Sequence, residues 1–212
     1  YGATAGYDGN ETLHGMGGDD EMYGNTGDDI MYGEDGDDRI YGESGDDTII
    51  GGTGNDQLNG GYGNDTYHFE LGDGVDTISD FQDSDAESRY DKIVFGEGIK
   101  AEDVVIDREG NDLKIKYSDE DSITVSNAYG DYWGRQGRYM VENIEFADGT
   151  HLYEDDINRE AAIRYGSEED DVMNGYGATA GYDGNETLHG MGGNDTIRGY
   201  DGSDTLYGDE GL

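Results

Sequence analysis

The sequence predicts an all-β protein, a solenoid of short parallel strands built from nine-residue repeats, with a small β unit between two blocks of repeats. Three observations lead to this fold class. The repeats keep their phase over long stretches, as in GDDRIYGESGDDTIIGGTGNDQLNG at residues 36–60. The chain holds 39 glycines and no proline or cysteine. Between the two blocks, apolar and polar residues alternate with the two-residue period of strands.

Composition limits the classes of partner. Only 32% of the residues are hydrophobic, and the formal net charge is -40. Such a chain buries too little apolar surface to offset its conformational entropy, so composition alone predicts disorder unless a component is added. The negative charge disfavours nucleic acids and anionic membranes and favours cations. The absence of cysteine excludes disulfides and thiolate metal sites.

The nonapeptides fill both ends of the chain. In the first block, residues 1–79, they begin at Gly6, Gly15, Gly24, Gly33, Gly42, Gly51 and Gly60, with an irregular one at Leu71. The second block, residues 166–212, has them at Gly166, Gly181, Gly190 and Gly199. The sequence starts within a repeat and shows neither a signal peptide nor an apolar run long enough for a membrane span. We therefore expect a piece of a longer protein.

Residues 80–165 have a different composition and form the predicted middle unit. Ten of the 12 basic residues lie between Arg89 and Arg164. The segments DKIVFG, EDVVID, NDLKIKYS and DSITVSN have strand patterning. Residues 109–111 and 118–120 have turn composition. One short helix is expected around residues 155–163, with Asp155 or Asp156 as its N-cap.

A longer repeat is superimposed on the short one. Residues 1–18 recur without a change at residues 176–193. The identity predicts that the whole module occurs in tandem in the parent protein. Tandem modules favour a role as a spacer or in multivalent binding over catalysis.

Each position of the nonapeptide G-x-x-G-x-D-x-U-x has a physical task. Glycine at positions one and four permits tight turns that expose backbone carbonyls. Aspartate at position six adds a carboxylate oxygen. Hard oxygen ligands in a flexible loop select Ca²⁺, which takes six to eight oxygens, over Mg²⁺, which demands a strict octahedron. We expect several calcium ions, about five to ten from the ligand arithmetic.

The last three positions of each nonapeptide predict a very short strand whose central residue points inward. Two nonapeptides complete one coil, so residues eighteen apart stack on one face, between two parallel sheets. The expected core residues are Leu13, Met22, Met31, Ile40, Ile49, Leu58, Tyr67 and Ile78 in the first block, and Met173, Leu188, Ile197 and Leu206 in the second.

The repeats resemble the calcium-binding nonapeptides of RTX (repeats-in-toxin) proteins. GGTGNDQLN at Gly51 and GGYGNDTYH at Gly60 match the family pattern G-G-x-G-x-D-x-U-x at every defined position. The resemblance implies a parallel β-roll in which Ca²⁺ lies between the turns of repeats i and i+2. The ligands it implies are Asp20, Asp29, Asp38, Asp47, Asp56, Asp65, Asp76, Asp171, Asp195 and Asp204. Two repeats depart from the pattern with Glu11 and Glu186 at position six.

The middle unit resembles the haemolysin-type calcium-binding-related domain that follows nonapeptides in many RTX proteins. The resemblance rests on GNDTYHFELGDGVDTISDF, DKIVFGEGI and the strands that follow. It implies broader strands that continue or cap the roll. The segment AYGDYWGRQGRYM holds Trp133, Arg135 and Arg138, which either cap the roll or bind a glycan or protein.

No catalytic pattern stands out. There is no H-E-x-x-H zinc signature and no nucleophile elbow, and the carboxylate pairs are too abundant to single out an acid and a base. We expect a chain that is not an enzyme. The resemblance implies a secreted or surface bacterial protein, a toxin, adhesin or exoprotein. It also implies export by type I secretion machinery and folding on Ca²⁺ outside the cell.

Overall fold

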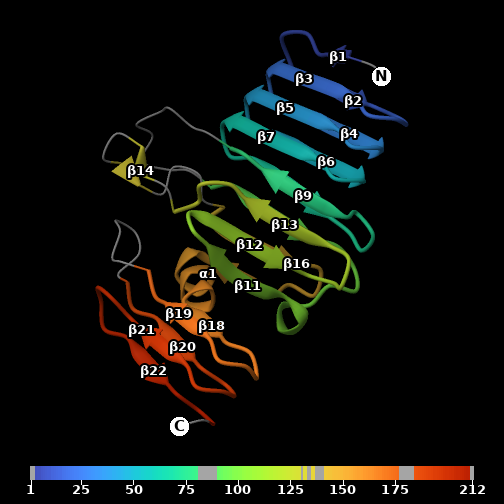
Figure 1. Ribbon diagram of the computed structural model, residues 1–212. Helices are drawn as coiled ribbons and strands as arrows, with labels where there is room; N and C mark the ends of the chain where they lie inside the picture. Colours follow the sequence, from blue (N-terminus) through green and yellow to red (C-terminus); the bar gives the residue numbers. More distant parts are fainter. Residues whose placement is uncertain are drawn as a thin grey trace.

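The computed structural model describes residues 3–80, 90–129, 131–132, 135–136, 141–176 and 184–210. Over these residues the chain consists of short strands, one α-helix, α1 (Glu154–Ala161), and one 3-10 turn, η1 (Ala101–Asp103). Figure 1 shows the strands stacked along one axis from the N-terminus to the C-terminus. The predicted all-β class, a parallel β-roll, is confirmed.

The first block coils between two parallel sheets. One sheet takes β1 (Ala3–Ala5), β3 (Glu21–Thr26), β5 (Arg39–Ser44), β7 (Gln57–Tyr62) and β9 (Val75–Ile78). The other takes β2 (Thr12–His14), β4 (Ile30–Asp35), β6 (Thr48–Thr53) and β8 (Thr66–Phe69). Met22 pairs with Ile40, and Ile40 with Leu58, so one coil spans two nonapeptides as the sequence predicts.

The core of the roll is one side chain deep on each strand. Met22, Met31, Ile40 and Ile49 are fully buried, whereas their neighbours in each strand face outward. On the outer face, Tyr23 stacks on Tyr41 at 5.1 Å between ring centroids, which is the cross-strand contact expected of aromatic residues. In the second block Leu206 departs from the prediction with 46% exposure, because β22 is the last strand of its sheet among the described residues.

The middle strands extend both sheets of the roll. In one sheet β10 (Lys92–Phe95) lies parallel to β8 and to β16 (Asn143–Phe146), and β17 (His151–Tyr153) closes it antiparallel. In the other, β13 (Ser122–Val125) lies parallel to β9 and is followed by antiparallel β12 (Asp112–Lys116) and β11 (Val105–Glu109). Phe95, Leu113 and Ile144 join the core of the first block in one hydrophobic cluster.

Helix α1 packs against β11 and β17 and buries Ile157 and Ala161. Its N-cap is Tyr153, so the expected cap at Asp155 or Asp156 was wrong. The Asp156 carboxylate stands at the third helical position and accepts a hydrogen bond from the Tyr153 amide at 3.3 Å. The helix begins at Glu154, one residue earlier than expected, so Asp155 and Asp156 lie within its first turn.

The second block forms two small parallel sheets beside the helix. One joins β18 (Ile163–Tyr165), at the end of the middle unit, to β20 (Thr187–His189) and β22 (Thr205–Tyr207), and the other pairs β19 (Val172–Asn174) with β21 (Thr196–Arg198). A two-stranded ribbon, β14 (Asp131–Tyr132) and β15 (Arg135–Gln136), stands apart from them. Trp133, Arg138 and the side chain of Arg135 lie outside the described residues. Within the described part of the chain, no helix has the length and apolar character of a membrane span.

Candidate metal centre

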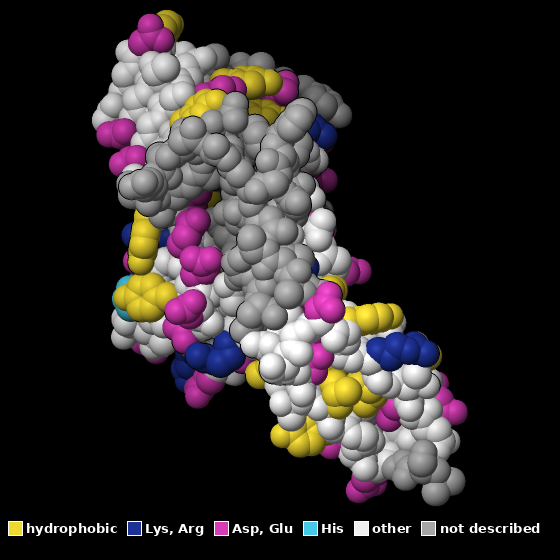
Figure 2. Space-filling model, turned by 90° about the vertical axis from the view of Figure 1, so that its left-hand side faces the viewer, with side chains coloured by type: hydrophobic (Ala, Val, Ile, Leu, Met, Phe, Trp, Pro, Cys, Tyr) yellow, Lys and Arg dark blue, Asp and Glu magenta, His cyan; other side chains and the backbone are white. Residues whose placement is uncertain are grey.

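The predicted ligand aspartates stand in two columns, one along each sheet, immediately before the strands. In the first block all seven are buried, with exposures of 7% or less: Asp20, Asp29, Asp38, Asp47, Asp56, Asp65 and Asp76. In the second block Asp171, Asp195 and Asp204 are half-buried. The roll therefore holds its densest charge inside its turns. Figure 2 shows further Asp and Glu side chains along the visible surface of the molecule.

One oxygen of each buried carboxylate ties adjacent coils together. The Asp29 amide donates to Oδ1 of Asp47 at 2.8 Å, and the Asp47 amide donates to Oδ1 of Asp65 at 2.8 Å. The same ladder runs through the other column, where the Asp38 amide donates to Oδ1 of Asp56 at 2.8 Å. Each carboxylate is thereby held in one orientation by the coil before it.

The second oxygen of these carboxylates is buried and has no hydrogen-bond partner among the described residues. This holds for Oδ2 of Asp29, Asp38, Asp47, Asp56, Asp65, Asp76 and Asp195. A buried charged oxygen without a partner is costly, and buried charges in proteins are paired or coordinate metals. The recurrence of the same orphaned atom in successive turns indicates a ligand position rather than a packing defect.

Glycine at position one leaves the space beside that oxygen open. A Cβ atom on Gly42 would clash with Oδ2 of Asp47 and would lie 2.6 Å from the carbonyl oxygen of Gly60. The atoms that border the space are thus carboxylate and backbone carbonyl oxygens, the donor set that Ca²⁺ prefers. The residues present fit a calcium ion at each such turn.

Burial raises the pKa of six of the carboxyl groups in the first block, those of Asp29, Asp38, Asp47, Asp56, Asp65 and Asp76. The pKa rises to about 7 for Asp47 and Asp56 and to about 8 for Asp76. It rises to about 9 for Asp65, where the charge of Asp80 adds to the burial. A bound cation would favour the charged carboxylates, which desolvation disfavours.

The side chains of the two glutamates at position six make different hydrogen bonds from those of the buried aspartates in the first block. The Glu11 amide still donates to Oδ1 of Asp29 at 2.7 Å, so the backbone ladder is intact. The longer side chain of Glu11 instead accepts a hydrogen bond from the Tyr7 amide at 3.1 Å, and Glu186 accepts one from the Tyr176 amide at 3.0 Å. Glu11 thereby closes its own turn, whereas the partner of Glu186 lies before the nonapeptide that begins at Gly181.

The ladder contains acidic residues that the repeat pattern does not include. Oδ1 of Asp91 accepts the Asp65 amide at 2.8 Å, and Oε2 of Glu142 accepts the Asp91 amide at 2.9 Å. Asp91 has a sequence signal, because DKI in the middle unit repeats the D-x-U order of the nonapeptide and Ile93 pairs with Tyr67. Glu142 has none, because its place depends on how the middle unit folds back.

Aspartates at position five make a second ladder on the outside. Oδ1 of Asp37 accepts the Asn55 amide at 2.8 Å, and Oδ1 of Asp46 accepts the Asn64 amide at 2.9 Å. Both carboxylates are exposed. They stabilise the turn and stand away from the buried oxygens.

Comparison with known proteins agrees with this arrangement. The family "RTX calcium-binding nonapeptide repeat (4 copies)" matches residues 5–40, 41–78 and 180–211. The family "Haemolysin-type calcium binding protein related domain" matches residues 112–156. These families cover both blocks of repeats and a large part of the middle unit.

Individual relatives are more distant. The iron-regulated protein FrpA of Neisseria meningitidis serogroup C is 36% identical over 87 residues, a match that covers 41% of this chain and 8% of that protein. The extracellular lipase LipA from Serratia marcescens matches 99% of this chain and 28% of its own, with 20% identity and a TM-score of 0.23, at which the likeness carries no argument. The family assignment rests on the repeats and not on these two relatives: the chain belongs to the RTX family of calcium-binding nonapeptide repeat proteins.

Proposed function

We propose that this chain is a calcium-binding module of a secreted bacterial protein, a toxin, adhesin or exoprotein, that folds when calcium binds. The observation that carries the proposal is the buried Oδ2 oxygen, left without a hydrogen-bond partner in turn after turn. The repeats are those of a calcium-binding family. Six to eight oxygens around a Ca²⁺ ion require more than one turn, so binding joins successive coils.

The residues of the chain explain why folding and binding are coupled. Without a cation, assembling the roll brings buried carboxylates such as Asp38, Asp47 and Asp56 out of water with their charges uncompensated. The core, one side chain deep on each strand, contributes too little burial to offset that cost and the ordering of many glycines. Metal affinity is then part of the folding free energy.

The coupling suits export as an unfolded chain. RTX repeat proteins are typically extracellular. In our proposal, low calcium inside the cell keeps the chain extended for type I secretion machinery, and millimolar calcium outside folds it. Affinities of roughly 10⁻⁴ to 10⁻³ M, usual for extracellular calcium modules, fit such a switch.

A second role, as a tandem spacer, is favoured by the joint between the middle unit and the second block. Residues 176–193, identical to residues 1–18, lie in the second block, which follows the middle unit. There β20 pairs in parallel with β18, and the Thr187 amide donates to the carbonyl of Ala162 at 3.0 Å. Repeated joints of this kind would build one long, calcium-stiffened rod.

Far-UV circular dichroism during a calcium titration tests the proposal. We expect a cooperative change from coil to β structure near millimolar Ca²⁺, reversed by a chelator. Magnesium is the control and should not produce the change, because it keeps its water and its octahedral geometry. A spectrum rich in β structure in chelator would overturn the proposal.

We further propose that this chain acts by binding and not by catalysis. The buried carboxylates are engaged in a structural ladder, and the fold repeats one turn many times rather than assembling a single constellation of acid, base and nucleophile. In the presence of calcium, the isolated chain should turn over no member of a panel of esters, peptides and glycans. Turnover that is saturable and lost on heat denaturation would contradict this.

A further inference from the structure

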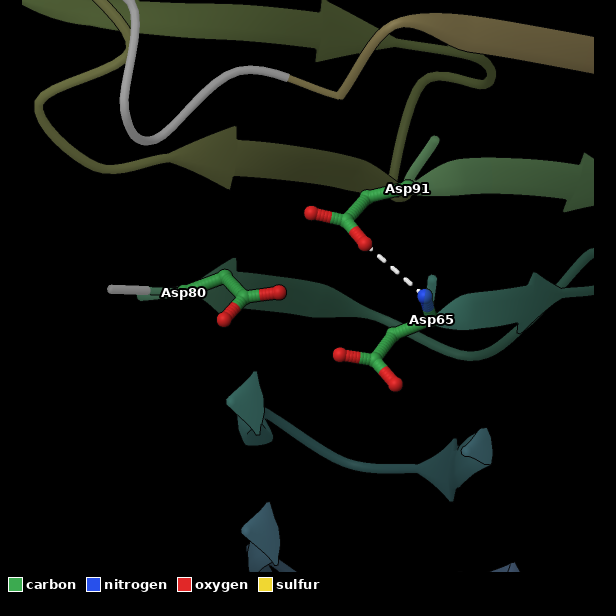
Figure 3. A group of neighbouring side chains, drawn as sticks. All are labelled: Asp65, Asp80 and Asp91. Carbon is green, nitrogen blue, oxygen red and sulfur yellow. Dashed lines mark hydrogen bonds between the residues drawn. The ribbon is translucent and has the colours of Figure 1, made fainter. Parts of the chain in front are cut away.

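Three buried aspartates meet where the first block joins the middle unit. The ligand atoms of Asp65, Asp80 and Asp91 all lie within 4.8 Å of one another. The side chains come from three separate places, before β8, after β9 and before β10, and are 0%, 4% and 5% exposed. Figure 3 shows the three carboxylates facing one another across a small space.

Asp80 takes a place that glycine holds in the coils above. Leu58 pairs with Ile78, so Asp80 stands beside Gly60, the first residue of its nonapeptide. The Gly61 amide donates to Oδ1 of Asp80 at 2.9 Å, which fixes this register. In the repeats, glycine leaves room beside the position-six carboxylate. In this coil, Asp80 adds a second carboxylate at the same place.

Tyr67 positions Asp80 from inside the core. Its hydroxyl donates to Oδ2 of Asp80 at 2.6 Å and accepts the Gly60 amide at 2.7 Å. The corresponding core residues of the neighbouring coils, Ile49 and Leu58, are aliphatic. The tyrosine hydroxyl is therefore present in the coil that contains the additional aspartate, Asp80, and it holds that side chain in place.

An orphaned atom gives a second, independent sign of a ligand. Oδ2 of Asp65 is buried and has no hydrogen-bond partner among the described residues, although Asp65 is fully shielded from solvent. Oδ1 of Asp91 accepts the Asp65 amide at 2.8 Å, which holds the third carboxylate beside the other two. Three acidic groups packed this closely, with almost no exposure to solvent, favour a cation beside them.

We propose that Asp80 adds a third carboxylate to the turn site of Asp65 and Asp91 and makes it a calcium site of higher charge than the turn sites of the other repeats. A repeat turn offers the buried position-six carboxylates together with glycine carbonyls, whereas this site adds Asp80 at the glycine position. Because more ligand charge raises calcium affinity, the site fills first and joins the roll to the middle unit. The inference rests on the proposed function only in naming calcium as the ion.

The test compares Asp80→Asn, Asp80→Gly and Asp46→Asn in the full chain, with bound Ca²⁺ counted by native mass spectrometry and affinity measured by calorimetry. Asp80→Gly restores the residue of the ordinary repeat, and Asp46→Asn removes an exposed carboxylate from a neighbouring coil. We expect both Asp80 variants to fold in calcium and to lose the tightest binding step, with its midpoint raised at least about tenfold. Asp46→Asn should bind as the parent chain does.

Tyr67→Phe supplies a second readout, because it removes only the hydroxyl that orients Asp80. It should weaken the tightest step and leave the number of ions at saturation unchanged. An unaltered tightest step in both Asp80 variants would overturn the site. Failure of the parent chain to bind calcium at all would instead reject the proposed function.

Discussion

At the scale of single residues, the two oxygens of one carboxylate have different roles. In Asp47, Oδ1 accepts the amide of Asp29 in the previous coil, and Oδ2 is left for a cation. An asparagine at this position keeps a carbonyl oxygen for the ladder but removes the negative charge. The structural and the metal-binding contributions of the side chain are therefore separable.

Asp47→Asn should raise the calcium concentration at the folding midpoint. We expect a rise of about tenfold, equivalent to about 1.4 kcal/mol, because one buried ligand loses its charge. Asp46→Asn is the matched control, since its exposed carboxylate stands next to Asp47 in sequence and only closes the outer turn. Calcium titrations followed by circular dichroism would measure both midpoints, and equal shifts in the two variants would contradict the assignment.

The raised pKa values predict how the calcium-free chain responds to acid. The folded-state pKa is about 7 for Asp47 and Asp56 and about 9 for Asp65, all above the ordinary value of 3.8. The folded chain thus binds protons more tightly than the unfolded chain. Their contribution to stability is fully present below the ordinary pKa and is lost as the pH rises through about 7 to 9.

In chelator, lowering the pH from about 8 to about 5 should therefore increase the β structure of the chain. Circular dichroism at constant ionic strength measures this. In the folded chain protons and calcium compete for the same oxygens, so the calcium affinity of the roll should fall over the same range. A β signal that stays flat or decreases on acidification would show that the buried carboxylates do not set the stability of the metal-free roll.

The sequence located the position-six aspartates that form the buried ladder of the first block, but not every acidic residue of that ladder. The fixed nine-residue phase identifies Asp47 and Asp65, because each coil repeats the same turn. Asp80 and Glu142 do not follow the nine-residue phase of the repeats. Asp80 reaches the site through a pairing offset of twenty residues at β9, and Glu142 through the fold of the middle unit. Such positions depend on tertiary structure.

At the scale of the elements, the turn and the strand depend on glycine for different reasons. Gly45 adopts a left-handed φ of 137° in its turn. Gly42 lies within β5 and has no room for a Cβ, which would clash with the Asp47 carboxylate. The first requirement concerns backbone conformation, and the second concerns the space reserved for the cation.

Gly42→Ala should therefore destabilise the calcium-bound roll. We expect a loss of about 1–3 kcal/mol from overpacking beside a buried carboxylate. Gly17→Ala is the control, because a Cβ there meets nothing within 4 Å and the residue is not left-handed. Urea unfolding in saturating calcium would compare the two. Equal stabilities would mean that the space beside Asp47 is not needed.

At the scale of the whole molecule, the two sheets run without a break from the first block into the middle unit. β10 continues one sheet and β13 continues the other, and a single hydrophobic core lies between the two sheets. The two-residue alternation predicted these strands, since DKIVFG and DSITVSN each contain one. Their parallel pairing with β8 and β9 was not predictable from alternation, because a period of two is the same in parallel and antiparallel sheets.

The account makes calcium part of the fold, and amide hydrogen exchange measured with and without calcium tests this most directly. The amides of Asp47 and Thr48 bond to neighbouring coils, the first to the Asp65 carboxylate and the second to the carbonyl of Asp29. We predict slow exchange at both in millimolar calcium and fast exchange in chelator at neutral pH. Equal protection of these amides in chelator would contradict the central claim, because the roll would then hold together without the cation.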